Sequence, residues 1–333
     1  MLIWLVLIPL IAAALIGLCK APARPTALLS ASLTLALGIW ALVSFDGCSS
    51  CWSRFEGMDL QLTLAPALSK VMLLLTILVT FATVLGTNPP QGGEASWYNS
   101  ALLISAGATG AFLSDNIISF FAFHELALIP TFVMIGLYGR GDRRTTAWRA
   151  TLYLGLASMV LLAALLMIGT QAGFTFSGLK DFMASGRELA HAELIGALLI
   201  AGFGTLISLF PFHSWAAPAY ASAPAPVAMM HAGVLKKFGL YGLFMFQPLM
   251  ETGFLPWTNI LLVLLVCNVI WVGYVTVNQK RLDLLLGNSS VMHMGYIFLA
   301  FAALVVSGSA EANPWALKGA ALLMLAHGLT IAL

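Results

Sequence analysis

The sequence has few charged residues and few cysteines. Of its 333 residues, 8% are charged, against roughly 25% in an ordinary soluble domain. This shortage excludes a soluble globular protein and a highly charged disordered tail. Four cysteines in so long a chain exclude a small disulfide scaffold. A net charge of +2 without a basic stripe excludes nucleic acid as a partner.

Long apolar runs make up most of the chain. Hydrophobic residues account for 60% of it, and the mean hydropathy is +0.96. Unbroken apolar runs of about 18 residues or more are typical of membrane helices, whereas barrel strands are shorter and alternate. The sequence therefore predicts an all-α, polytopic transmembrane helix bundle that contacts the lipid bilayer. The eleven predicted spans are 2–18, 27–44, 66–86, 98–114, 117–138, 150–171, 194–210, 222–247, 258–277, 286–307 and 315–333.

Basic residues in the loops predict how the chain is oriented. They concentrate after the first, fifth and ninth spans, as Lys20, Arg24, Arg140, Arg143, Arg144, Arg149, Lys280 and Arg281. Cytoplasmic loops carry an excess of Lys and Arg. We therefore expect a multi-pass protein of the bacterial inner membrane with its N-terminus outside. The chain stops within an apolar run at Leu333, so we expect further helices beyond it, and a natural end is the alternative.

Prolines interrupt the chain after the seventh span. Pro211 begins a stretch that also contains Pro218, Pro224 and Pro226, and it predicts a broken helix near Pro211. Irregular backbone at membrane depth occurs where it lines a cavity or is buried in protein. His213 lies at this break, where it either relays protons or binds a freed carbonyl. The longest polar stretch, 174–193, predicts a short interfacial helix.

Ionisable side chains inside apolar spans are the candidate functional residues. Such groups are costly to bury and usually line an ion or proton path. Glu125 lies about eight residues into the fifth span and is a candidate proton carrier, with a static ion pair as the alternative. His124, its neighbour, should point about 100° away on a helix and reads as a packing residue.

Two adjacent lysines, Lys236 and Lys237, lie in the middle of the eighth span. They are too deep to reach the interface easily, and two neighbours cannot face the same partner. We expect at least one of them to exchange protons, and two fixed ion pairs are the alternative.

Two further histidines occupy the last two spans. His293 and His327 each lie near a glycine that allows close helix approach, and histidine titrates near neutral pH. A lone histidine is more often structural, but two in adjacent spans indicate a buried relay. Cys48 and Cys51 form a C-x-x-C pair in a loop, where a disulfide is possible. The motifs that bind nucleotides or haem are missing, so we expect no cofactor on this chain.

An ordered set of segments resembles the antiporter-like membrane subunits of respiratory complex I and of multisubunit cation/proton antiporters. The resemblance is greatest to the chain M type of bacterial complex I, the counterpart of mitochondrial chain 4. The segments that carry it are Phe123-His-Glu-Leu-Ala-Leu-Ile-Pro130, Pro211-Phe-His-Ser-Trp215, 222–237 with its prolines and lysines, 279–295 with Ser289-Ser-Val-Met-His293, and Met324-Leu-Ala-His-Gly-Leu329.

The resemblance implies a subunit of about fourteen helices whose proton half-channels join along a charged axis. Residues 1–333 would then be one antiporter-like domain, with three N-terminal helices in 1–97 and an incomplete proton-translocating core in 98–333. Glu125 matches the family glutamate, Lys237 its connecting lysine, and His293 and His327 its relay histidines.

Leu206 is the main departure from the family pattern, because the family has a lysine five residues before the proline that matches Pro211. Lys236 is an extra cation, and the basic pair before the tenth span is altered to Asp283 and Leu284.

Three functions follow from the resemblance. The first is a proton-translocating subunit of an NADH:quinone oxidoreductase, with Glu125, Lys236, Lys237, His213, His293 and His327 as its relay. Its partners would be other membrane-arm subunits, and the whole complex would use quinone and NADH. The second is a subunit of a cation/proton antiporter. The third is a membrane-arm scaffold that has lost pumping, which Leu206 favours.

Overall fold

The structure is a computed structural model that describes residues 1–44, 49–51, 60–308 and 313–332. Seven of its helices are long and apolar enough to cross a membrane, and the shorter apolar helices α1 (Leu2–Gly17) and α8 (Ala192–Leu206) add to them. The chain is a multi-pass helical membrane protein, as the sequence predicts. Cys48 lies outside the described residues. By its contacts the chain divides into two compact units, which interleave along the sequence.

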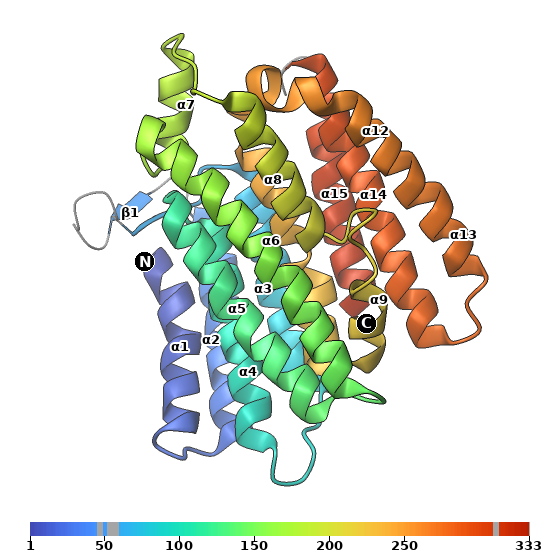
Figure 1. Ribbon diagram of the computed structural model, residues 1–333. Coiled ribbons are helices and arrows are strands. Elements are labelled where there is room, and N and C mark those ends of the chain that lie inside the picture. The colour runs from blue at the N-terminus through green and yellow to red at the C-terminus, as the bar shows by residue number, and fades with distance from the viewer. Residues whose placement is uncertain (45–48, 52–59, 309–312, 333) are drawn as a thin grey trace. The chain divides into compact units, whose positions relative to one another are not determined.

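The first unit contains residues 1–147, 222–235 and 328–333. Its helices α1, α2 (Ala23–Ser44), α3 (Ala67–Gly86), α4 (Glu94–Leu113) and α5 (Ile117–Tyr138) pack side by side, as Figure 1 shows. A short antiparallel pair joins β1 (Ser49–Cys51) to β2 (Gln61–Thr63). The helix α10 (Ala225–Met230) and the π-helical turn η1 (His231–Leu235) pack on α3.

An N-terminal cap and two glycines of the neighbouring helix α4 position the helix α5. The side chain of Asn116 accepts hydrogen bonds from the backbone N–H groups of Ile118 and Ser119, both at 2.9 Å, and thereby caps the helix. A Cβ at Gly107 would lie 2.6 Å from the Phe123 carbonyl oxygen, and one at Gly110 would overlap the Phe123 ring. These glycines let α4 and α5 approach closely.

The second unit contains residues 148–221 and 236–327. Its elements are most of α6 (Arg143–Ala172), α7 (Phe176–Ala184), α8, α9 (Ala216–Ser222), α11 (Lys237–Met245), η2 (Gln247–Leu249), η3 (Met250–Phe254), η4 (Leu255–Trp257), α12 (Thr258–Val266), η5 (Cys267–Trp271), α13 (Val272–Val277), α14 (Leu282–Ser307) and most of α15 (Pro314–Ala332). Within it α14 packs against α11, α12 and α13, and α8 packs against α11.

Each predicted apolar run coincides with one helix or a series of short ones. The predicted span 117–138 has the bounds of α5, and α7 is the short helix expected in the polar stretch. The break near Pro211 is also present, since α8 ends at Leu206 and α9 begins at Ala216. The sequence reading missed the π-helical turns η1 and η5, which interrupt the eighth and ninth spans.

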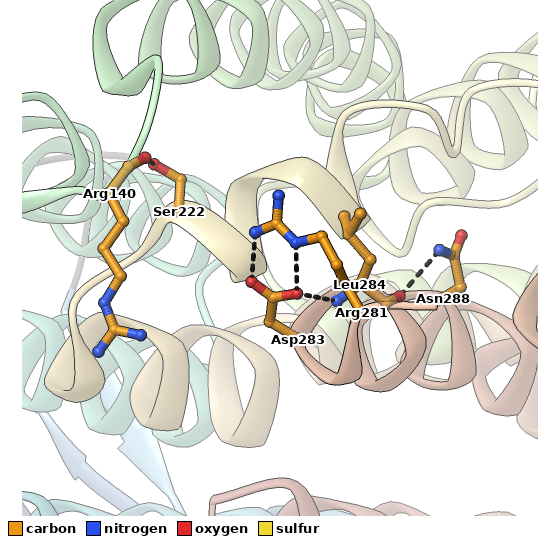
Figure 2. Close-up of polar contacts among 6 residues, drawn as sticks. All are labelled: Arg140, Ser222, Arg281, Asp283, Leu284 and Asn288. Carbon is orange, nitrogen blue, oxygen red and sulfur yellow. Dashed lines mark hydrogen bonds and ion pairs between the residues drawn. The ribbon is translucent and has the colours of Figure 1, made fainter. Parts of the chain in front are cut away.

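The start of α14 is closed by a salt bridge, which Figure 2 shows. The Arg281 guanidinium donates to both carboxylate oxygens of Asp283, at 3.1 and 2.6 Å, and this hydrogen bonding raises the pKa of Arg281. Asp283 also accepts from the Leu284 N–H at 2.8 Å. An acidic residue in the first turn interacts favourably with the positive end of the helix dipole. Asp283 therefore stabilises the start of this helix where the family pattern has a basic residue.

Candidate functional site

Two fully buried lysines begin α11. Lys236 is 1% exposed and Lys237 is 0% exposed. The π-helical turn η1 ends just before them, and Lys236 occupies the N-cap position of α11. The two side chains have different partners, as expected for neighbours on a helix. Both lie within an apolar span, where a charged side chain is costly unless polar groups surround it.

A chain of nitrogen atoms runs from Lys237 through two histidines. The Lys237 Nζ lies 2.9 Å from Nδ1 of His327 on α15. The His327 ring lies 5.5 Å from the His293 ring on α14, centroid to centroid. His293 Nδ1 is 2.8 Å from the Ser289 carbonyl oxygen, one turn earlier in the same helix. Three helices of the second unit thus bring their titratable groups together.

The hydrogen bond of His293 fixes the tautomer of its ring. A carbonyl oxygen only accepts, so Nδ1 of His293 carries a hydrogen and its Nε2 is available to accept a proton. The Lys237 Nζ and Nδ1 of His327 share a hydrogen bond in which either nitrogen can be the donor. The second ring nitrogen of His327 is Nε2. This buried Nε2 has no hydrogen-bond partner among the described residues.

Lys236 is held by weaker contacts. Its Nζ lies 3.4 Å from the hydroxyl oxygen of Ser290 and 5.2 Å from the centre of the Tyr220 ring. A hydroxyl and an aromatic face both favour a cation without neutralising it. Within the described part of the chain, no carboxylate lies at ion-pair distance from Lys236.

The break after α8 is fixed by Asn268 of the π-helical turn η5. Asn268 is fully buried; its side-chain oxygen accepts from the Phe210 N–H at 3.0 Å, and its Nδ2 donates to the Val291 carbonyl at 3.0 Å. A Cβ at Gly295 would lie 2.8 Å from this Nδ2, so the glycine makes room for it. The irregular backbone is thereby tied to α14, which carries His293.

His213 lies in the same break but outside the nitrogen chain. Its ring stacks on Phe210 at 5.4 Å between centroids, and its buried Nδ1 has no hydrogen-bond partner among the described residues. No described hydrogen bond joins it to the lysines or to the other histidines. Its role as a relay stays a prediction.

Leu206 occupies the position where the family pattern has a lysine. Its side chain is 4% exposed at the end of α8. A Cβ built on Gly239 of α11 would lie 3.5 Å from the Leu206 Cβ, so the two helices meet here. The position faces the helix of Lys237 and is filled by an apolar side chain.

Glu125 belongs to the first unit and is half-buried, with 33% of its side chain exposed. Its carboxylate lies 3.3 Å from Nδ1 of the buried His124. The expectation that His124 points away from Glu125 is therefore wrong, because the flexible glutamate side chain turns back to its neighbour. His124 joins Glu125 as a polar pair within the membrane.

Residues 114–333 match the family described as NADH:quinone oxidoreductase/Mrp antiporter, transmembrane. The chain belongs to this family. The matched region contains all the candidate residues, including Glu125, both lysines and His327. The resemblance drawn from the motifs is thus confirmed.

Curated relatives within this family are longer than the chain. The NAD(P)H-quinone oxidoreductase chain 4 2 of Microcystis aeruginosa is 32% identical over 272 residues, which cover 80% of this chain and 47% of the relative. The chain spans about half the length of the curated relatives it matches.

Two solved structures share the fold. A chain of respiratory complex I from Thermus thermophilus matches with a TM-score of 0.82 at 24% identity, covering 99% of this chain and 71% of that one. A chain of the Mrp complex from Dietzia matches with a TM-score of 0.86 at 20% identity, covering 99% and 36%.

Three polar residues of the site were missed by the sequence reading. Ser290 and Tyr220 contact Lys236, and Asn268 holds the break. Asn268 was detectable, because a lone amide within the apolar run 258–277 is costly unless it is hydrogen-bonded. The partners of Lys236 were not, since they come from helices distant in sequence.

Proposed function

We propose that this chain is a proton-translocating membrane subunit of a respiratory NADH:quinone oxidoreductase. The observation that carries the proposal is the contact of a fully buried lysine amine with a histidine on another helix, followed by a second histidine on a third. Side chains of this kind at membrane depth are expensive and typically mark proton paths.

In this proposal a proton moves from Lys237 to His327 and then to His293. The Lys237 ammonium gives a proton to Nδ1 of His327, and His327 releases the proton on its Nε2. The next acceptor is Nε2 of His293, reached through a water between the rings. His293 keeps its own Nδ1 hydrogen on the Ser289 carbonyl, which holds its ring in an accepting orientation.

Lys236 would control the charge state of Lys237. A second ammonium next to Lys237 disfavours its protonated form. Glu125, with His124 beside it, is the proton carrier that we assign to the first unit. His213, with an unpartnered buried nitrogen at the broken helix, would connect Lys236 to water.

The remaining assignments concern the assembly. We assign residues 98–333 to the proton-translocating core and 1–97 to the helices that flank it. NADH and quinone would react on other subunits, which are the partners in the membrane arm. The basic loops after the first, fifth and ninth spans support an N-terminus outside the bacterial inner membrane.

The test is the proton-to-electron ratio of the assembled complex in sealed vesicles. His327→Gln keeps the size of the side chain but removes its relay capacity, so we expect fewer protons moved per electron at a similar rate of quinone reduction. Lys237→Ala and Glu125→Gln should act in the same direction. His191→Gln is the control, because His191 is an exposed histidine at the N-cap position of α8 and lies outside the relay.

An unchanged ratio in His327→Gln and Lys237→Ala, with normal assembly, would refute proton movement by this chain. The scaffold function would then be the better reading, and the apolar Leu206 at the α8–α11 contact is the observation that favours it. A cation/proton antiporter subunit is the other alternative, and Na⁺-dependent proton uptake without quinone would support it.

A further inference from the structure

Two apolar grooves lie on either side of α8 in the second unit. One, of about 390 Å³, is lined by α6 residues Leu152, Leu156 and Val160 and by Ala201 and Phe212. The other, of about 170 Å³, lies between α8 and α12 and shares Ala201 and Phe212. The helices α6 and α8 lie side by side in Figure 1, and a Cβ at Gly202 would lie 3.0 Å from the Leu161 Cβ.

A cationic, hydrogen-bonding cluster occupies the polar end of the larger groove. The exposed Arg149 guanidinium donates to the Ser214 hydroxyl at 3.0 Å, and the Tyr153 hydroxyl lies 3.0 Å from the same oxygen. Tyr153 also lines the groove. Among the described residues, no carboxylate forms an ion pair with Arg149. Four of its five N–H groups therefore remain for a ligand.

Along α6, the residues of the larger groove and its polar end extend over about the thickness of one leaflet of the bilayer. Arg149, Tyr153, Leu156 and Val160 recur every three or four residues and so share one helix face. From Arg149 to Val160 the helix rises by about 16 Å, and half of the hydrocarbon core is about 15 Å. Trp148, exposed next to Arg149, is the residue type that favours the headgroup level.

We infer that this surface is a binding site for one acidic phospholipid. The headgroup phosphate would bind Arg149, with the Ser214 and Tyr153 hydroxyls beside it, and the two acyl chains would occupy the two grooves around Phe212. An uncharged ligand would leave the permanent charge of Arg149 without a counter-ion. The inference is independent of the proton relay, since none of these residues belongs to it.

The experiment counts lipids retained by the full chain. The protein is released from bilayers containing equal amounts of phosphatidylglycerol and phosphatidylcholine, and native mass spectrometry gives the ratio of the two in the first bound lipid. We expect phosphatidylglycerol to dominate and Arg149→Gln to lower the ratio about fivefold, the usual effect of one basic residue at an anionic surface. Arg149→Lys should retain most of the preference, which also shows that the position tolerates substitution.

Two further variants distinguish specific binding in the grooves from diffuse electrostatic attraction of acidic lipids to the basic segment. Arg144→Gln removes an exposed charge from the same basic segment, and we expect it to leave the ratio unchanged. Ala201→Phe fills both grooves and should reduce retention of phosphatidylglycerol itself.

Four outcomes would overturn the inference. One is an equal loss of preference in Arg144→Gln and Arg149→Gln, which would mean diffuse surface attraction. Another is displacement of the lipid by glycerol 3-phosphate, which would mean a headgroup site alone. The third is full retention in Ala201→Phe, because the chains would then lie elsewhere. The last is a complete multisubunit assembly that holds no lipid here, because a partner helix would then cover the grooves.

Discussion

Replacing Asn268 by leucine should destabilise the second unit through two hydrogen bonds. The substitution keeps the volume of the side chain but leaves the Phe210 N–H without its acceptor and the Val291 carbonyl without an added donor. An unsatisfied N–H costs about 1–3 kcal/mol, and the second bond contributes about 0.5–1.5 kcal/mol because this carbonyl also serves α14. We expect a loss of roughly 2–4 kcal/mol in the free energy of unfolding.

Thermal unfolding in detergent measures this loss, and hydrogen exchange at the Phe210 amide locates it. Asn278→Leu is the matched control, since Asn278 is exposed at the end of the same span and, among the described residues, its side chain bonds to the Tyr274 carbonyl alone. That change should stay within about 0.5 kcal/mol. If Asn268→Leu were as stable as the parent and the Phe210 amide stayed protected, the proposed tie between the break and α14 would be wrong.

Three other changes test the packing. Gly196→Ala should lower the unfolding temperature, because its Cβ would collide with a backbone carbonyl of η3, whereas Gly155→Ala, with nothing within 4 Å, should be neutral or slightly stabilising. Leu206→Lys should cost roughly 3–5 kcal/mol if the site is dry, and a much smaller loss in the same unfolding assay would reveal water there. Thr87→Val should cost about 1–3 kcal/mol by stranding the indole N–H of Trp97, and a double variant with Trp97→Phe should lose less than the sum of the two.

The candidate site was visible in the sequence only as separate residues. Glu125, Lys237, His293 and His327 stand out because a polar group in an apolar span is rare. Which of them meet is a different matter, since His327 is ninety positions from Lys237 and the contact depends on how α11 and α15 pack. Likewise the pairing of His124 with Glu125 depends on a side-chain rotamer, which helical periodicity does not specify.

The sequence alone determined that the protein is a helical membrane protein, where its spans lie and that one of them breaks near Pro211. These follow from local physics, because a run of apolar residues must form helix in lipid and proline cannot sustain one. The tertiary structure decided that Asn268 holds the break and that Lys236 faces Ser290, while Lys237 faces His327. Contacts of this kind join helices far apart in the chain, so no short stretch of sequence contains the information that selects them.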